Sequence, residues 1–375
     1  MTSFMRMACL GFAACFSSAA NAQTFNLDKA KPAIEKAIRA ELAKGSASVS
    51  LALVQGGRIV WSAAYGFSNA TTQTPATTAT IYSTGSTAKS IAAVAVMQLV
   101  EQGKIELDAP VNRYLRTARV KDRLQVDEAV TIRQLLTHSS GLTCDVRVTP
   151  VFSRTLPPSL ADMTARAYTV RKPKDKYEYC NVGYGVLGYV VEQVSGVEYE
   201  KYLVDNILKP VGVETPAPIR PTARMADLLA QPYVPKDGKP QPVDRMFYDV
   251  YPAGDLYMTP TDMAKYLGMQ LNNGTFNGKR ILTEASMNEI HRDQSVTKEF
   301  PYGFGLIVNK GTDGHTIISH TGGTPGFTTY MIGDMDLKVG AYVMTNSSSP
   351  NRPLEIGRAA LDQLRGSVLK LTTEP

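Results

Sequence analysis

The sequence predicts an α/β (α+β) fold, in which one antiparallel sheet is built from both chain ends and flanked by helices, with a mostly helical lobe inserted. Short apolar runs typical of β-strands lie near both ends of the chain. Between them, apolar residues recur every three or four positions and long polar loops intervene, which indicates helices. We therefore expect an α/β lobe of about residues 23–80 and 250–375 and a helical lobe of about residues 81–249.

The N-terminal part of the sheet is predicted from one helix and one hairpin. Residues 28–42 carry an apolar face at helical spacing, and β-rich runs follow at residues 48–54 and 58–65. Gly56-Gly57 joins the two runs and is a hairpin signal. The C-terminal part of the sheet is predicted from apolar runs and a closing helix, at residues 303–308, 316–319, 327–332, 339–346 and 353–364.

Four apolar segments predict the main helices of the helical lobe, at residues 91–100, 130–136, 181–194 and 199–208. The first of them is apolar on nearly every side, and a helix of that kind is buried. We therefore expect residues 91–100 to form a central, buried helix.

Residues 1–22 have the pattern of a signal peptide. Arg6 gives a positive start, a short apolar run follows, and Ala20-Asn21-Ala22 has the small residues of a cleavage site. The apolar run is too short to span a bilayer, and no later segment has the pattern of a membrane span. We expect an exported protein, periplasmic or secreted after cleavage near Ala22, whose mature part is residues 23–375.

Composition excludes several partners and cofactors. The formal net charge is +6, and loss of Arg6 with the signal peptide lowers it to +5. The basic residues form no run, so we expect no nucleic-acid partner. The four histidines show no metal-ligand spacing, so we expect no metal, and we expect no other cofactor. The oligomeric state stays open.

Two cysteines, Cys144 and Cys180, remain after cleavage of the signal peptide. Two are too few for a disulfide framework. Export would permit a bond between them, but nothing in the sequence sets the geometry that a bond requires. We expect two free thiols.

A serine stands at the entrance of the predicted buried helix. Ser86 precedes the apolar segment and Lys89 follows one turn later, so both side chains would lie on one helix face. Burial favours the neutral form of a lysine amine, which can then take the proton of a serine hydroxyl. The N–H groups at the start of the helix suit a developing oxyanion. The sequence therefore predicts an activated serine nucleophile.

The pattern Ser-x-x-Lys also begins at Ser295 and at Ser367, which shows how little it specifies alone. Pro301 follows the first of these closely and would stop a helix. The second lies near the end of the chain, where helices fray. Only Ser86 heads a long apolar helix.

Two further motifs, residues 179–181 and 320–323, specify little in isolation. Tyr179-Cys180-Asn181 precedes an apolar helix, which fits a packed tyrosine and an N-cap asparagine. His320-Thr321-Gly322-Gly323 follows an apolar strand, which fits a strand end with a glycine turn.

Taken with Ser86 and Lys89, these motifs resemble those of the serine β-lactamase and penicillin-binding protein superfamily. The resemblance is strongest to its class C β-lactamase-like branch, which includes D,D-carboxypeptidases, D-aminopeptidases and esterases. Four further segments are similar to that branch, residues 103–108, 132–142, 252–256 and 302–305. The resemblance extends over nearly the whole mature chain and implies a β-lactamase/transpeptidase-like fold.

The resemblance also implies a role for each motif. Ser86 would form an acyl-enzyme, and Lys89 and Tyr179 would share the proton transfers. Which of these two is the general base stays open. Backbone N–H groups of Ser86 and Gly323 would form the oxyanion hole. The substrate-binding residues would be Asn181, His320, Thr321 and Gly322.

Two residues depart from the motifs of the superfamily. His320 stands where the third motif usually has lysine, and Cys180 stands where serine is common. A histidine is cationic only part of the time near neutral pH, whereas lysine would face a substrate carboxylate as a permanent cation. In the branch that the sequence resembles, histidine at this position is familiar among D,D-peptidases and other D-amino-acid-specific members. The resemblance therefore favours peptide or ester hydrolysis over penicillin destruction, and we expect D-amino-acid peptides as substrates, in the manner of a D,D-carboxypeptidase. One alternative is a β-lactamase or carboxylesterase with the same residues. A less favoured alternative is a non-catalytic penicillin-binding protein, because a protein that only binds has no need of both Lys89 and Tyr179.

Overall fold

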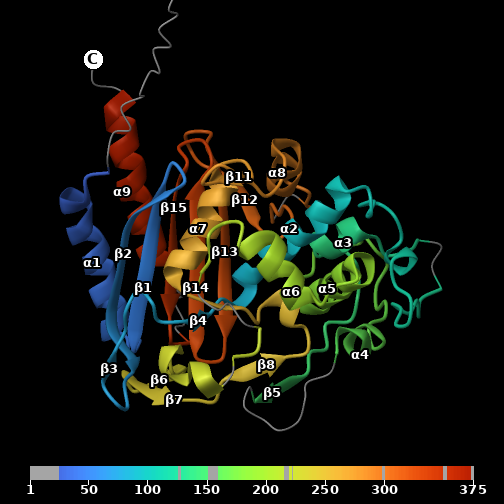
Figure 1. Ribbon diagram of the computed structural model, residues 1–375, viewed down its shortest axis with the longest axis horizontal. Coiled ribbons are helices and arrows are strands. Elements are labelled where there is room, and N and C mark those ends of the chain that lie inside the picture. Colours follow the sequence, from blue (N-terminus) through green and yellow to red (C-terminus); the bar gives the residue numbers. More distant parts are fainter. Residues whose placement is uncertain are drawn as a thin grey trace, which may run out of the picture.

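Seven strands from the two ends of the chain form one antiparallel sheet. They are β1 (Ser48–Gln55), β2 (Arg58–Asn69), β3 (Thr74–Pro75), β12 (Ile307–Lys310), β13 (Thr316–Thr324), β14 (Phe327–Asp334) and β15 (Val339–Thr345). Their order in the sheet is β12-β13-β14-β15-β1-β2-β3, and each neighbouring pair is antiparallel. The strands from the two chain ends meet where β15 pairs with β1, near the centre of the sheet (Figure 1). In this pair Leu51 lies opposite Val343.

The computed structural model describes residues 25–125, 128–150, 159–214, 219–221, 223–297, 300–348 and 353–372. The segment expected to be a signal peptide, residues 1–22, lies outside the described residues. Among the described helices, none combines the length and the apolar character that a membrane crossing requires.

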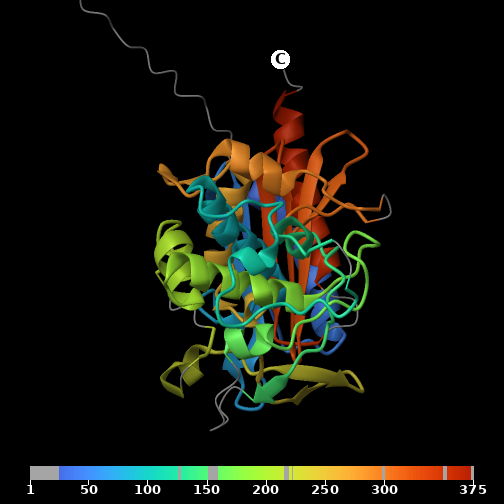
Figure 2. The same cartoon turned by 90° about the vertical axis from the view of Figure 1, so that its right-hand side faces the viewer.

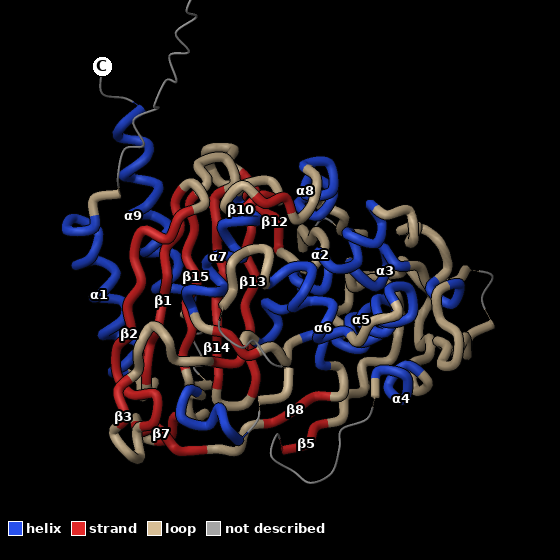
Figure 3. Tube along the Cα trace, in the orientation of Figure 1, coloured by secondary structure: helices blue, strands red, loops and turns tan. Residues whose placement is uncertain are grey.

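Helices cover both faces of the sheet (Figures 1 and 3). On one face lie α1 (Leu27–Ala43) and α9 (Leu354–Thr372), and on the other lies α7 (Pro260–Leu271). The alternation of side chains along β1 explains this arrangement, because successive residues of a strand point to opposite faces. Leu51 and Leu53 join the core under α1 and α9, whereas Ala52 and Val54 join the core on the α7 side.

A second group of helices packs beside the sheet and is seen in front of it in Figure 2. It contains α2 (Ala88–Glu101), α3 (Ile132–Leu136), α4 (Leu160–Thr164), α5 (Asn181–Ser195) and α6 (Tyr199–Leu203). Short 3₁₀ or π turns accompany them, η1 (Gly85–Thr87), η2 (Val111–Arg113), η3 (Val204–Leu208), η4 (Ala223–Leu228) and η5 (Tyr251–Ala253). The central helix of the group is α2, whose residues from Ala88 to Met97 are all buried.

Smaller elements complete the described chain. Helix α8 (Glu284–His291) follows α7, and four two-stranded sheets pair β4 (Tyr82–Ser83) with β9 (Tyr257–Met258), β5 (Val148–Pro150) with β8 (Met246–Tyr248), β6 (Tyr233–Lys236) with β7 (Lys239–Pro242), and β10 (Thr275–Phe276) with β11 (Lys279–Arg280).

The structure confirms the predicted fold class, an antiparallel sheet from both chain ends flanked by helices. It corrects the strand predicted at residues 303–308, because β12 begins only at Ile307. Gly303 N–H donates to the carbonyl of Leu306, which makes this segment a turn. Gly305 has a φ of 74° and packs so closely on the Lys89 carbonyl that a Cβ atom would lie 2.6 Å from the oxygen. A left-handed residue in that position cannot continue a strand.

Candidate active site

Ser86 lies in the turn η1, between β4 and the buried helix α2. Hydrogen bonds hold this turn against the sheet. The Thr84 carbonyl accepts from the hydroxyls of Thr87 at 2.9 Å and Thr329 at 2.7 Å, and the Thr87 hydroxyl lies 2.6 Å from that of Tyr342. Because Thr329 and Tyr342 belong to β14 and β15, the sheet fixes the position of the Ser86 backbone.

Lys89 is fully buried in the first turn of α2, and its Nζ lies 3.0 Å from Ser86 Oγ. Nζ also donates to the carbonyl of Ala253 at 2.7 Å. Burial lowers the pKa of Lys89 well below its usual value, against the smaller opposing effect of the charges of Cys180 and Asp255. The structure therefore places an amine that favours its neutral form beside the Ser86 hydroxyl.

Glycines allow the backbone of β13 to approach Ser86 closely. A Cβ atom on Gly322 would lie 2.1 Å from the Thr84 carbonyl oxygen and 3.2 Å from the Ser86 nitrogen. A Cβ atom on Gly85 would lie 2.4 Å from the Gly323 nitrogen. The two N–H groups expected to form the oxyanion hole, those of Ser86 and Gly323, thus lie in adjacent segments of backbone.

Tyr179 comes to the same place from the loop before α5. Its ring centroid lies 4.7 Å from Lys89 Nζ and 6.2 Å from the ring of His320. The side chain is 39% exposed, whereas Lys89 is inaccessible. Tyr179 therefore lies where the buried amine meets solvent, which suits a group that exchanges a proton with substrate.

His138 holds the loop that carries Tyr179 before α5. No role for His138 was predicted from the sequence. Its carbonyl accepts from the Glu178 N–H at 2.8 Å, and its Nδ1 accepts from the Cys180 N–H at 3.1 Å. The two bonds flank Tyr179, whose ring packs on the imidazole at a centroid distance of 4.3 Å. Burial, then the charges of Lys89 and His320, lower the pKa of His138 well below its usual value, so the ring is neutral.

A hydrogen-bond chain continues from His138 to His320 through Tyr302. The Tyr302 hydroxyl lies 3.2 Å from His138 Nε2 and 3.1 Å from His320 Nε2. Because His138 Nδ1 accepts a bond, Nε2 carries its proton and donates to Tyr302, which in turn donates to His320 Nε2. His320 Nδ1 then carries the proton that binds the Thr321 carbonyl at 2.7 Å. The tautomer of each ring follows from this network.

The remaining expected site residues lie nearby. Thr321 and Gly322 belong to β13, opposite Tyr330 and Thr329 of β14. Asn181 is the first residue of α5 and is half-buried, with Cys180 rather than Asn181 at the N-cap. Within the described residues, no hydrogen bond joins the Asn181 side chain to Lys89.

The other two Ser-x-x-Lys serines have ordinary structural contacts. The Ser295 hydroxyl donates to Asp293 at 2.6 Å in the segment after α8. The Ser367 hydroxyl donates to the Gln363 carbonyl inside α9 at 2.8 Å. Of the three serines, Ser86 alone is hydrogen-bonded to a lysine amine within the described residues.

Comparison with known proteins places the chain in a family. The family model described as Beta-lactamase matches residues 34–365, which is most of the chain. The chain belongs to the β-lactamase family. The family and the fold support a serine hydrolase.

Relatives and solved structures agree with this family. Protein flp of Staphylococcus aureus (strain N315) is 24% identical over 331 residues, which cover 85% of this chain and 64% of that protein. The chain thus spans just under two thirds of the length of such relatives. The octameric penicillin-binding protein homologue from Pyrococcus abyssi superposes with a TM-score of 0.73 and 26% identity, over 91% of this chain and 78% of that one.

The D-amino acid amidase from Ochrobactrum anthropi, in its complex with L-phenylalanine amide, has the same fold. It superposes with a TM-score of 0.71 over 92% of this chain and all of that one, at 22% identity.

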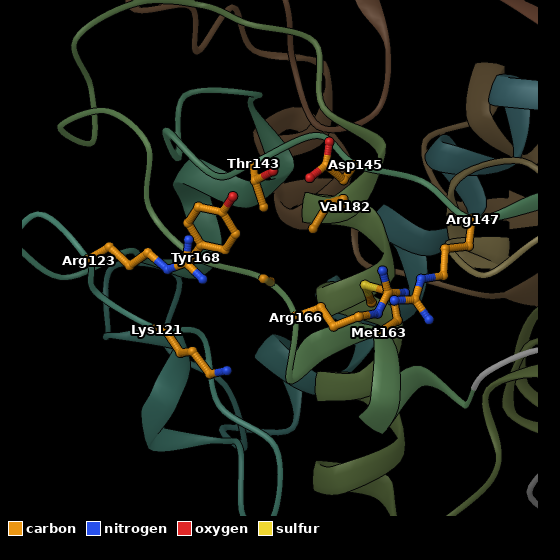
Figure 4. A pocket seen from close by; sticks show the side chains of 10 residues that line it. Lys121, Arg123, Thr143, Asp145, Arg147, Met163, Arg166, Tyr168 and Val182 are labelled. Atoms are coloured by element: carbon orange, nitrogen blue, oxygen red, sulfur yellow. The ribbon is translucent and has the colours of Figure 1, made fainter.

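A cavity of about 360 Å³ has a lining that includes none of Ser86, Lys89, Tyr179 and His320 (Figure 4). Its described lining contains four basic side chains and the carboxylate of Asp145. Arg166 pairs with the buried Asp249, and the Arg123 guanidinium stacks 3.4 Å above the centre of the Tyr168 ring. Among the described residues, this cavity is therefore separate from the candidate active site at Ser86.

One group of possible metal ligands was not foreseen from the sequence. His315, Asp334 and Asp336 lie together at the end of the sheet, with ligand atoms within 4.8 Å of one another. His315 Nδ1 lies 2.9 Å from Asp334, and Arg365 Nε lies 2.9 Å from the same carboxylate. Because His315 and the Arg365 guanidinium already contact the Asp334 carboxylate, we assign no metal to this group.

Replacing His138 by phenylalanine is expected to lower kcat about tenfold or more and to change KM less. The variant keeps an aromatic ring beside Tyr179 but removes the acceptor of the Cys180 N–H, and a buried donor without a partner costs about 1–3 kcal/mol. His291→Phe is the matched control, because His291 is also buried and bonded, to Gln270 at 2.7 Å, on α8. Equal losses of kcat in the two variants would show that His138 does not position Tyr179.

Proposed function

We propose that this chain is an exported serine hydrolase that acts through a Ser86 acyl-enzyme on amide bonds of D-amino-acid peptides, in the manner of a D,D-carboxypeptidase. The observation that carries the mechanism is the fully buried Lys89 amine 3.0 Å from Ser86 Oγ. The family match over residues 34–365 supports the same chemistry.

In the proposed acylation, Lys89 is the general base. A neutral amine has two N–H groups and one lone pair. The bond to the Ala253 carbonyl uses one N–H, which leaves the lone pair able to accept the Ser86 hydroxyl proton at 3.0 Å. Ser86 Oγ then attacks the substrate carbonyl. The backbone N–H groups of Ser86 and Gly323 donate hydrogen bonds to the oxyanion that forms.

In the following step, Tyr179 gives a proton to the leaving amine. Its partial exposure and its contact with Lys89 support this role, since a proton can pass from the lysine side to the substrate side. Water then attacks the acyl-enzyme, and Tyr179 and Lys89 transfer protons in the reverse direction, so that the acid is released and the Ser86 hydroxyl is restored. Asn181, the first residue of α5, would hold the substrate amide.

The preference for carboxylate-bearing peptides rests on His320 and Thr321. In the neutral network, both His320 nitrogens have protein partners, Tyr302 and the Thr321 carbonyl. A neutral His320 therefore offers a carboxylate no further donor, whereas protonation gives the ring a positive charge that attracts the carboxylate. We propose that carboxylate binding is coupled to protonation of His320.

The test compares a D-alanyl-D-alanine peptide, a neutral short-chain ester and a chromogenic cephalosporin. We expect the peptide to have the highest kcat/KM near neutral pH. The ratio of kcat/KM for peptide to that for ester should fall as pH rises through the range of histidine titration, about pH 6–7. Using a ratio cancels the titration of Lys89 and Tyr179, which both substrates share.

His320→Lys is the control for this ratio. Lysine keeps its charge over the same pH range unless strongly desolvated, so the ratio should then be constant with pH. A wild-type ratio that does not change with pH removes the support for D-peptide substrates. Turnover of the ester or the cephalosporin alone would instead favour the alternatives, a carboxylesterase or a β-lactamase with the same residues.

A further inference from the structure

The side chains of Cys144 and Cys180 come from two adjacent chain segments beside the candidate active site. Both are free in the structure, as the sequence predicted. Each sulfur lies near the carbonyl that precedes the other cysteine. Cys180 Sγ is 3.4 Å from the Thr143 oxygen, and Cys144 Sγ is 4.0 Å from the Tyr179 oxygen. The two sulfurs also share the Leu142 carbonyl, at 3.6 Å from Cys144 and 4.0 Å from Cys180.

This reciprocal arrangement shows that the two chain segments are adjacent at the cysteines themselves. A disulfide requires Cα atoms no more than about 7 Å apart and Cβ atoms that face each other. Side chains that each contact the backbone next to the other favour both conditions.

The surroundings of the two thiols differ. Cys144 is exposed in the loop before β5, whereas Cys180 is only 3% exposed at the N-cap of α5. An external reagent therefore reaches Cys144 first. Cys180 stands between Tyr179 and Asn181, two residues of the candidate site.

We propose that Cys144 and Cys180 are a covalent modification site that reacts with an external disulfide and becomes an intramolecular disulfide. In the first step, the Cys144 thiolate attacks the external disulfide, which gives a mixed disulfide and one released thiol. In the second step, the Cys180 thiolate attacks Cys144 Sγ and displaces the second thiol. The two cysteines lose two protons and two electrons, and the external disulfide becomes two thiols.

The electrostatics fit this order of steps. The pKa of Cys180 is lowered by the hydrogen bond from Cys144 and also by the backbone N–H groups of Gly183 and Val182. The backbone groups remain after Cys144 has reacted, so they favour the thiolate needed in the second step. The same bond, followed by burial, raises the pKa of Cys144, so the first step should accelerate as pH rises. The inward cysteine thus resolves a mixed disulfide rapidly once the outward cysteine has formed it.

The bond should leave Tyr179 in place. Each sulfur already lies within 4.0 Å of the carbonyl before the other cysteine, and the N–H groups on both sides of Tyr179 are held by His138. Closing the loop between residues 144 and 180 reduces the freedom of the unfolded chain. We therefore expect the oxidised protein to melt about 5 °C or more above the reduced protein, with kcat/KM changed by less than about threefold.

The experiment treats the reduced, purified protein with oxidised glutathione and measures intact mass, melting temperature and ester hydrolysis. The expected wild-type product lacks two hydrogen atoms and carries no glutathione. Cys180→Ser should keep one glutathione on Cys144, because the resolving thiol is absent. Cys144→Ser should resist modification, because Cys180 is buried, and neither variant should gain melting temperature on oxidation.

Each of three results would overturn the proposal. They are a stable glutathione adduct on the wild type, two free thiols per chain when the treated protein is denatured and titrated, and a loss of hydrolysis on oxidation. The mass readout does not depend on the substrate of the enzyme. Failure of the proposed peptide hydrolysis therefore stays distinguishable from failure of the cross-link.

Discussion

Ser86→Ala is expected to lower kcat by at least about a thousandfold, because the variant removes the atom that forms the acyl-enzyme. Melting temperature should change little, since the Thr84 and Thr87 hydrogen bonds that hold the turn do not involve the Ser86 side chain. The measurement is steady-state hydrolysis of the best substrate of the panel, with melting temperature as the check on folding.

Two serines of the chain provide matched controls for Ser86. Ser295 and Ser367 stand in the same Ser-x-x-Lys pattern, but their hydroxyls bind Asp293 and the Gln363 carbonyl. Ser295→Ala and Ser367→Ala should therefore hydrolyse substrate at close to the wild-type rate. Residual activity of Ser86→Ala above about a tenth of wild type would contradict a nucleophilic role.

Lys89→Arg is the second change with a large expected effect. The guanidinium is not deprotonated in proteins, so it cannot accept the Ser86 proton, and kcat/KM should fall about a thousandfold or more. Lys89→Met should lose as much activity without loss of stability, because it removes a buried amine and keeps an unbranched apolar side chain. The pair separates loss of the base from loss of packing.

The wild-type pH profile gives an independent check on Lys89. Burial lowers its pKa well below the usual lysine value, and the neutral amine is the active form. Activity on the neutral ester should therefore fall as pH drops through the lowered pKa and should already be high well below pH ~10, where an ordinary lysine titrates. A rising limb centred near the ordinary lysine value, or full activity of Lys89→Arg, would be inconsistent with Lys89 as the base.

Much of the fold follows from local sequence patterns. Alternating apolar runs at both chain ends predicted the sheet, and Gly56-Gly57 predicted the hairpin of β1 and β2. The helices α7 and α8 were not predicted, although Thr259 and Thr283 are N-caps whose side chains accept the bonds expected at a helix start. In α7, Met263, Leu267 and Leu271 also recur every four positions and are all buried, which is a second local signal of a helix. The division into two lobes stays a prediction.

The candidate site was only partly accessible to sequence reasoning. Ser86 and Lys89 are neighbours on one helix, so local spacing was enough to pair them. The Ala253 carbonyl that fixes the Lys89 amine lies 164 positions away in the sequence. Contacts of this kind, including those of His138 with Cys180 and Tyr302, depend on the tertiary fold and leave no local pattern.

The most direct measurement of the Ser86 acyl-enzyme is the site of covalent labelling. The protein is incubated with a fluorophosphonate or a labelled penicillin, digested, and analysed by mass spectrometry. The expected result is one adduct on the peptide that contains Ser86, absent from Ser86→Ala and retained in Ser295→Ala and Ser367→Ala. An adduct on any other serine, or equal labelling of Ser86→Ala, would contradict the proposed mechanism.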